Sequence, residues 1–457
     1  MRISLCAAAC LVISSGCIDR PVAAVSPGTS VEEQTEFPVV QNPDLDILFV
    51  IDNSFSMLAE QTSLATNFVR IAQALESLED GLPNIHIGVV STDVGAGSYA
   101  CPGNGDNGIL QNTPRVAGCS PPNGLYISNI DGTTNYSGTL EDTFSCIAQL
   151  GKDGCGFEQP LESMKRALDG SSPENAGFLR PNARLAVIII SDEDDCSATD
   201  PAMFERTGPA GTDLGPVKSF RCFEYGVTCD NGAPARAPGQ RNSCAPRTDS
   251  PYMPDVSSYV SFLKGLKQFD SDILVAGIVG DTSPVLVTQD AQGDPCLMYS
   301  CGDVPVCNGA DEQPAAVPPI RLQSFFEQFN NHYTATICDD DLSGEVQEIA
   351  DWMKRSLKGR CIQGTLADQD PVAPGVQAEC AIAEVRNPGG PDEHHRSLGE
   401  CDNPGSPESS SNLPCYQLAE NEAACAATPQ HLEVEIYYPT NDVVPPDTMI
   451  HAYCAGE

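Results

Sequence analysis

The stretch from Asp52 to Ser56 carries a carboxylate and two hydroxyl groups in the order Asp-x-Ser-x-Ser. It directly follows the apolar run Ile47 to Ile51, as expected at the end of a strand that is buried on both faces. Hard divalent cations such as Mg²⁺ prefer oxygen ligands and usually keep several waters. The residue types and their spacing therefore indicate a candidate cation site at the end of a strand.

A second acidic stretch, Ser191 to Asp195, follows another fully apolar run, Leu185 to Ile190. In α/β sheets the ligand crevice opens outside the carboxyl ends of the strands. We therefore expect Asp192 to lie at the same edge of the sheet as Asp52.

Catalytic chemistry finds little support in the sequence. Phosphatases of the haloacid dehalogenase type also have an aspartate after an apolar strand, but they need a second aspartate where this chain has Ser54. No G-x-S-x-G elbow, H-E-x-x-H motif or glycine-rich phosphate loop occurs. Of the six histidines, His394 and His395 lie in a polar loop and His451 in the terminal segment. We expect surface roles for them, and no enzymatic activity from the chain.

The elements that must position these residues alternate between strands and helices. Apolar runs predict strands, and apolar residues at spacings of three and four predict helices. The expected strands are 47–51, 85–90, 185–190, 273–279 and an edge strand at 333–337, and the expected helices are 56–78, 158–168, 256–269, 322–329 and 346–357. This alternation predicts an α/β fold, a Rossmann-like, doubly wound and mostly parallel sheet with helices on both faces.

Three long insertions interrupt this pattern, at about 95–145, 198–250 and 282–318, and each contains cysteines. Loops of this length in a compact domain are usually functional or disordered, and disulfides favour order. After residue 361 the helical periodicity is lost, and stretches of period two such as Leu432 to Ile436 appear. They predict a small, β-rich, cysteine-rich domain over 362–457.

The first residues are typical of an export signal, with a positive start, an apolar stretch and the small residues Ser14 to Gly16 before Cys17. Small residues before a cysteine resemble a bacterial lipobox, although Ser14 stands where leucine is commonest. This resemblance implies a signal peptide over 1–16, a lipid on Cys17 and, because Ile18 is not aspartate, the outer membrane. The alternative is an ordinary cleaved signal peptide. Prolines and few large apolar residues predict a flexible tether over 17–44.

Cysteine content and charge both bear on the environment of the protein. Without Cys6, Cys10 and Cys17, 18 of the 21 cysteines remain, an even number that fits nine disulfides and an oxidising compartment. Cutting after Cys361 leaves odd numbers on both sides, so either Cys361 bridges to the C-terminal part or another disulfide crosses the boundary. The formal charge of −39 argues against binding to nucleic acid.

The runs DILFVIDNSFSM and VIIISDEDDCS together resemble von Willebrand factor A (VWA) domains, and are similar to VWA lipoproteins of myxobacteria and other deltaproteobacteria. In that family an Asp-x-Ser-x-Ser sequence between a buried strand and a helix is the signature of the metal-ion-dependent adhesion site. The resemblance covers roughly residues 45–361. It implies Mg²⁺, with Mn²⁺ or Ca²⁺ as alternatives, held by Ser54, Ser56 and Asp192, with Asp52 acting mainly through water.

The family's remaining ligand is usually a threonine in the middle loop, and the matching stretch 154–161 contains none. Some relatives place a glutamate there, so Glu158 is the candidate substitute. The alternative is that Glu158 caps the next helix, where carboxylates are favoured. Thr143 is a weaker alternative ligand, and Asp194 could reach the metal, face solvent or cap a turn.

The resemblance implies a cell-envelope binding or adhesion-type protein, in which a protein partner supplies a carboxylate to the cation. The membrane is reached through the lipid anchor. Two alternatives remain open: a structural envelope protein whose metal site is degenerate, and a protein whose C-terminal domain is the binding module.

Overall fold

The computed structural model describes residues 32–38 and 44–456, apart from 79–81, 102, 116, 182, 207–213, 231–234, 268–269, 302–315, 340, 359–360, 371–375, 389–392, 422–424, 426–427, 440–441, 443 and 445–447. The chain forms two compact units. The α/β unit is Gln41–Gly359, and the β unit combines Met1–Val40 with Arg360–Glu457. The expected signal peptide and Cys17 lie outside the described residues.

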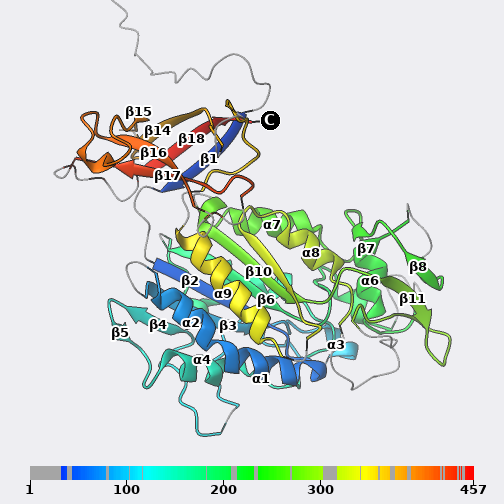
Figure 1. Cartoon of the computed structure of the whole chain (residues 1–457). Helices are drawn as coiled ribbons and strands as arrows, with labels where there is room; N and C mark the ends of the chain where they lie inside the picture. The colour runs from blue at the N-terminus through cyan, green and yellow to red at the C-terminus, as the bar shows by residue number, and fades with distance from the viewer. Residues whose placement is uncertain are drawn as a thin grey trace, which may run out of the picture. The chain divides into compact units, whose positions relative to one another are not determined.

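The α/β unit is built on a seven-stranded sheet in the order β13-β10-β6-β2-β3-β4-β5 (Figure 1). The five strands from β13 to β3 pair in parallel, and β4 and β5 are added in antiparallel fashion. The bounds are β2 (Asp44–Ile51), β3 (Asn84–Ser91), β4 (Ile127–Ile130), β5 (Thr133–Thr134), β6 (Arg184–Ile190), β10 (Ile273–Val279) and β13 (His332–Thr336). The sheet is thus mixed but mostly parallel, and β13 is the edge strand expected from the sequence.

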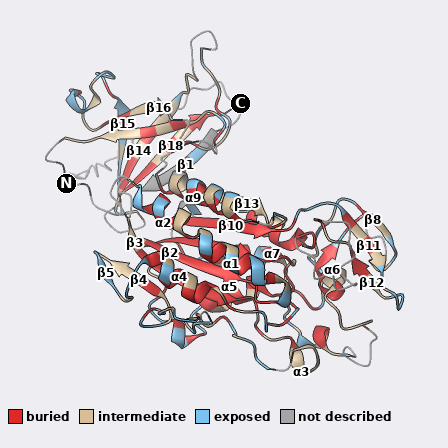
Figure 2. Cartoon of the chain, turned by 60° about the horizontal axis from the view of Figure 1, so that its bottom comes forward, coloured by how far each residue is buried: buried red, intermediate tan, exposed pale blue. Residues whose placement is uncertain are grey.

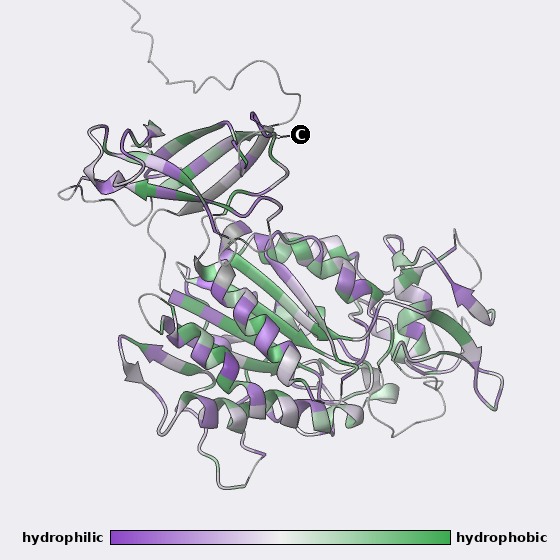
Figure 3. Cartoon of the chain, in the orientation of Figure 1, coloured by the Kyte–Doolittle hydropathy of each residue, from purple (hydrophilic) through white to green (hydrophobic). Residues whose placement is uncertain are grey.

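Helices cover both faces of this sheet because alternate residues of the central strands face opposite sides. In β2, Ile47 and Phe49 pack in one core cluster with α1 (Leu58–Asn67), α2 (Val69–Glu76), α4 (Leu140–Ala148) and α9 (Ser343–Lys358). Leu48 and Val50 pack in the other cluster with α5 (Pro160–Leu168), α7 (Val256–Lys264) and α8 (Ile320–Phe326). The strand residues are buried on both sides, and the central strands are mostly hydrophobic (Figures 2 and 3).

The three insertions contain short elements and disulfides. Beyond β4, β5 and α4, these elements are α3 (Gly97–Ala100), η3 (Pro201–Phe204), α6 (Phe220–Gly226), β7 (Val227–Thr228), β8 (Gly239–Arg241), β9 (Ala245–Pro246), β11 (Val285–Gln289) and β12 (Pro295–Leu297). One disulfide ties each insertion to a segment near the carboxyl ends of the strands: Cys101–Cys155, Cys196–Cys222 and Cys301–Cys338. Cys119–Cys146 and Cys229–Cys244 close loops within the first two.

The β unit is a six-stranded sheet in the order β1-β18-β14-β15-β16-β17. Its strands are β1 (Glu32–Pro38), β14 (Cys380–Arg386), β15 (His394–Glu400), β16 (Cys415–Glu420), β17 (Leu432–Tyr437) and β18 (Met449–Ala455). The flexible tether expected over 17–44 is wrong for residues 32–38, because β1 pairs antiparallel with β18 along its whole length. A polar strand at a sheet edge gives little sequence signal, since most of its stabilisation comes from backbone hydrogen bonds to its neighbour.

Disulfides explain the cysteine parity of the two parts. Cys361 bonds to Cys425, and the β unit also holds Cys380–Cys454 and Cys401–Cys415. The division falls before Arg360, whereas the sequence analysis places the boundary after Cys361. When Cys6, Cys10 and Cys17 are left out, moving the boundary by these two residues leaves an even number of cysteines on each side. None of the eight disulfides between described residues crosses it.

In the part of the chain that the structure describes, no helix is both long enough and apolar enough to span a bilayer.

Candidate cation site

Asp52 lies directly after β2 and ties together the ends of two neighbouring strands. Its side chain is fully buried. One carboxylate oxygen accepts the backbone N–H of Ser54 at 2.8 Å, and the other accepts the hydroxyl of Ser191 at 2.6 Å. The Asp52 N–H also donates to the carbonyl of Ile190, the last residue of β6, at 2.9 Å. Asp52 therefore shapes the loop, since both of its oxygens already accept protein hydrogen bonds.

The loop that Asp52 holds brings the two serine hydroxyls together. Ser54 Oγ and Ser56 Oγ lie 3.1 Å apart, just where the short helix η1 (Phe55–Met57) begins. Ser54 is buried and Ser56 is half-buried. Two neutral oxygens at this separation are suited to share one small cation.

Asp192 follows β6 and supplies a second carboxylate beside these serines. Its side chain is buried, and its Oδ1 accepts no hydrogen bond from the described residues. Burial raises the pKa of Asp192 well above its usual range, the charges of Asp52 and Glu193 raise it further, and a hydrogen bond with Ser56 opposes the shift. The carboxylate that the sequence places at the metal is thus beside Ser56 and lacks a countercharge.

Glu158 is buried at the same place and does not cap the following helix. Thr92 donates its hydroxyl to Glu158 Oε2, while Oε1 accepts no hydrogen bond from the described residues. The first free N–H groups of α5 go instead to Asp195 Oδ1, from Leu161 at 3.2 Å, and to Ser197 Oγ, from Glu162 at 2.9 Å. The capping interpretation is therefore wrong. Burial, and then the charge of Asp52, raise the pKa of Glu158 well above its usual range.

Asp194 and Asp195, the last two acids of the 191–195 stretch, act elsewhere. Asp194 accepts the backbone N–H groups of Arg321 and Leu322 at 3.0–3.1 Å and so caps the start of α8. Asp195 pairs with the fully buried guanidinium of Arg321 at 3.0 Å. Asp194 thus takes the capping role that the sequence left open, at a distant helix rather than at the following turn.

Thr143 is engaged inside a helix. It lies within α4, and its hydroxyl donates to the carbonyl of Thr139 at 2.8 Å. This contact occupies the hydroxyl as a donor and gives no support to Thr143 as the missing middle-loop ligand.

Sequence reasoning missed four residues that build the site. Thr92 and Ser191 directly follow β3 and β6, which is the signal that could have found them. Glu60 lies in the first turn of α1, is buried, and has an oxygen without a hydrogen bond among the described residues. Gln61 binds the carbonyl of Asp52 at 2.7 Å and both the carbonyl and N–H of Gly151, so it joins the first loop to the middle loop.

The buried carboxylates of this site would be stabilised by a bound cation, because they have no basic partner in the part of the chain that the structure describes. Among the described residues, neither Asp52, Glu158 nor Asp192 forms an ion pair with a basic side chain. Buried charges without a partner are strongly unfavourable. In that same part of the chain, no three His, Cys, Asp or Glu side chains form a group that could hold a metal by themselves. A cation here would therefore need the serine hydroxyls as well as the carboxylates.

Comparisons with known proteins give no family. No protein-family model matches the sequence, and no curated protein matches it either. Solved structures that are similar include the pilus adhesin SpaC of Lactobacillus rhamnosus GG (10% identity, TM-score 0.32), the mussel byssus protein PTMP1 (12%, 0.27) and the pilus adhesin RrgA of Streptococcus pneumoniae (11%, 0.27). These matches cover 93%, 70% and 92% of this chain but only 40%, 49% and 57% of the other chains. At these TM-scores the likeness is too low to support any argument about function.

Proposed function

We propose that the α/β unit is a von Willebrand A-type domain that binds Mg²⁺ or Mn²⁺, with Ca²⁺ as an alternative, and through the cation a protein partner. The observation that carries the proposal is the arrangement at the ends of β2 and β6. Two serine hydroxyls 3.1 Å apart lie beside two buried carboxylates, Asp192 and Glu158, each with one oxygen left without a hydrogen bond from the described residues. Ser54, Ser56, Asp192 and Glu158 would hold the cation.

Asp52 would hold the ligand-bearing loop in place and would not bind the cation directly. Because its oxygens accept hydrogen bonds from Ser54 and Ser191, it fixes the loop and leaves the coordination to its neighbours or to water. A charged ligand such as Glu158 in place of a neutral threonine would make the bound cation tighter and less electrophilic. A partner's Asp or Glu would still complete the coordination.

Two exposed hydrophobic side chains support a partner surface at this site. Phe55 is 60% exposed and Leu58 is 48% exposed, and they are the two large hydrophobic side chains of the described residues that stand out to solvent. Phe55 lies between the two serine ligands, with Lys152 Nζ 4.6 Å from the centre of its ring. Large exposed apolar groups beside a polar site are typical of protein contacts.

The location proposed for this function is the outside of the cell. Eight disulfides join described cysteines, which requires an oxidising compartment. A lipid on Cys17 would anchor the protein in the outer membrane. Under this proposal the chain has no catalytic activity of its own and, with a formal charge of −39, no nucleic-acid partner.

The test is calorimetric titration of the oxidised, metal-stripped chain with Mg²⁺ and Mn²⁺. We expect one saturable site that Asp192→Asn and Asp52→Ala abolish. Because the pKa values of Asp192 and Glu158 are raised, binding should release protons, so the measured enthalpy should change with the ionisation enthalpy of the buffer.

The matched controls are Asp153→Asn and Glu174→Gln, two exposed acids in the same unit, which should bind the cation as the unmodified chain does. Absence of binding in the folded, oxidised protein would contradict the proposal. It would favour a structural envelope protein with a degenerate site, or binding through the β unit.

A further inference from the structure

A cavity of about 280 Å³ lies beside the acidic loop and is formed by two of the insertions. One wall comes from the start of α6, with Phe220 and Phe223, and another from β12, with Cys296 and Leu297. The loop after β6 reaches it through Glu193, and Cys222 of its wall is joined to Cys196 of that loop. The cavity is thus a built feature of the insertions, separate from the serine hydroxyls.

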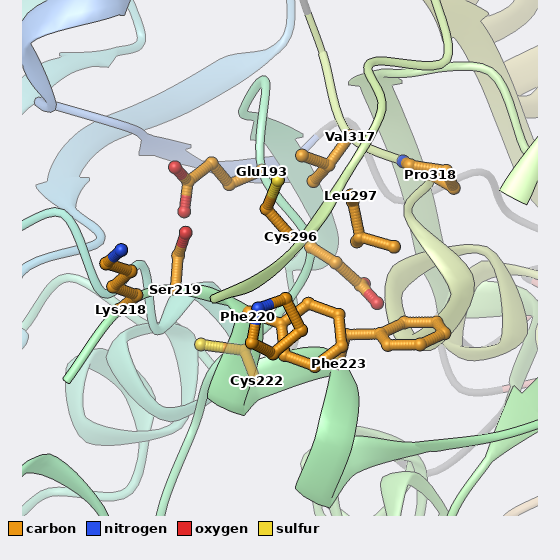
Figure 4. A pocket seen from close by; sticks show the side chains of 12 residues that line it. Glu193, Lys218, Ser219, Phe220, Cys222, Phe223, Cys296, Leu297, Val317 and Pro318 are labelled. Carbon is orange, nitrogen blue, oxygen red and sulfur yellow. The ribbon is translucent and has the colours of Figure 1, made fainter. Parts of the chain in front are cut away.

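The cavity has an apolar end and a polar end (Figure 4). The rings of Phe220 and Phe223, whose centres are 5.6 Å apart, lie together at one end. Glu193, Ser219 and Lys218 bring their polar groups to the other end. A ligand that fills it must therefore combine an apolar body with one polar head.

The polar groups at this end are not equally available. Lys218 already forms ion pairs with Asp290 and, at 2.8 Å, with Asp294. Asp194, which also lines the cavity, accepts the backbone N–H groups at the start of α8. The Glu193 carboxylate, by contrast, receives no hydrogen bond or ion pair from the described residues, which leaves it available to a ligand.

Charge decides which polar head fits. Two acidic side chains, Glu193 and Asp194, line the cavity, and the ammonium group of Lys218 in the same lining is already paired with Asp290 and Asp294 outside it. An anion would meet net repulsion, while a cationic head would pair with the Glu193 carboxylate at the polar end and leave its apolar body against the rings at the other end. The volume suits one amino-acid side chain or a small metabolite rather than a larger ligand.

We propose that this cavity binds an organic monocation, a primary amine or guanidinium group carried on an apolar or aromatic body. The cationic head pairs with Glu193 and the body packs on Phe220 and Phe223. The ligand is either a free amine or a lysine or arginine side chain of a protein partner. The site needs no divalent cation and takes a different ligand from the function proposed above, although Glu193 adjoins Asp192 in the sequence.

The experiment is a titration of the oxidised chain, both units present, in EDTA at pH 9, which is above the Glu193 pKa of about 8 produced by burial and leaves the amines protonated. Phenethylamine serves as the free amine, N-acetyl-lysine amide and N-acetyl-arginine amide as the side chains, and phenethyl alcohol and phenylacetate as neutral and anionic counterparts. We expect at least tenfold tighter binding of the cations than of their counterparts. Tighter binding of phenethylamine than of the two amides identifies a small-molecule site, and the reverse identifies a side-chain site.

Two substitutions with opposite expected signs make the test independent of folding. Glu193→Gln should weaken binding of the cations at least tenfold and leave the neutral alcohol unchanged. Lys218→Gln removes the competing positive charge and should tighten binding several-fold, a gain that a misfolded variant cannot produce. Equal binding of amine and alcohol, no effect of Glu193→Gln, or no binding of any cation would each overturn the proposal.

Discussion

Asp46 and Asp52 lie near the two ends of strand β2, and both are fully buried. They differ in the groups that stabilise their carboxylates. Asp46, near the start, accepts the backbone N–H of Arg180 at 2.6 Å and its guanidinium at 2.8 Å. Asp52, after the end, accepts a hydroxyl and a backbone N–H but pairs with no basic side chain among the described residues, and Glu158 and Asp192 are its acidic neighbours. Burial raises the pKa of both aspartates, but only at Asp46 does a positive charge oppose it.

Other buried acids follow the pattern of Asp46. Asp195 is paired with Arg321 inside the α/β unit. In the β unit, burial raises the pKa of Glu384, but hydrogen bonds from Arg386 and Arg396 outweigh it, so the pKa is lowered overall. Where the fold alone needs a buried acid, it supplies an arginine. Asp52, Glu158 and Asp192, at the carboxyl edge of the sheet, have no such arginine among the described residues, which is the difference a bound cation would remove.

The largest effect on stability is expected when Asp46 loses its arginine partner and so resembles Asp52. Arg180→Met leaves Asp46 buried without its cation and should lower the free energy of unfolding by about 3 kcal/mol. Trp352, the single tryptophan of the chain, lies in α9 and reports unfolding of the α/β unit by fluorescence in denaturant. Arg247→Met, which breaks an exposed pair with Asp249, should cost less than about 1 kcal/mol. Equal losses in the two variants would mean that burial of Asp46 does not set the cost.

The second effect is a pH dependence of the unfolding free energy, expected to be strongest in the cation-free protein. Burial, then the charge of Asp52, raises the pKa of Glu193 to about 8, and burial raises that of Asp194 to about 7. In the unfolded chain both titrate near their usual values, about 4. Between these limits the folded state keeps protons that the unfolded state has lost, so stability is lost as the pH rises through the folded pKa values. We expect unfolding free energy to increase from pH 8 to pH 5, by up to about 1.4 kcal/mol per pH unit for each group.

Saturating Mg²⁺ should reduce this dependence, because a bound cation favours the ionised form of Glu193 beside Asp192, whereas Asp194 caps α8 and keeps its contribution. The measurement is denaturant unfolding, followed by Trp352, across the pH range with Mg²⁺ and with EDTA. Identical slopes under the two conditions would show that the buried acids titrate without any link to a cation.

The smallest effect has the opposite sign to the first. In EDTA at pH 8, Asp192→Asn should raise the free energy of unfolding by about 1 kcal/mol, because it removes a buried charge that has no partner. Asp153→Asn, at an exposed position, should change little. A loss of stability in Asp192→Asn would show that this carboxylate supports the fold, as Asp46 does, and would remove the contrast between the two ends of β2.

The sequence predicts the central sheet well because buried strands give strong local signals. Ile273–Val279 was expected as a strand over the same residues, and β2, β3 and β6 differ from expectation by a few residues at their ends. The expected helix over 256–269 is shorter and ends at Lys264, where Gly265 follows. Strands β1, β4 and β5 were missed because they are short or polar, and their stabilisation depends on neighbours distant in sequence.

The candidate site was predictable only in part. Asp52, Ser54, Ser56 and Asp192 could be predicted because each lies within a few residues of the end of an apolar strand. The separate duties of Asp192, Asp194 and Asp195 could not be read from an acidic run, since α8 and Arg321 lie more than a hundred residues away. The role of Thr92 beside Glu158 likewise depends on the pairing of two distant loops.

Each insertion returns to the ligand edge of the sheet through a covalent bond. Cys155 lies three residues before Glu158, and Cys196 comes directly after Asp195. Cys338 lies two residues after the end of β13. Residues between these anchor points can therefore change in length and composition while the loops of the candidate cation site stay in place. Such a scaffold would let evolution, or an engineer grafting new loops, alter what the protein recognises without rebuilding the chemistry by which it holds on.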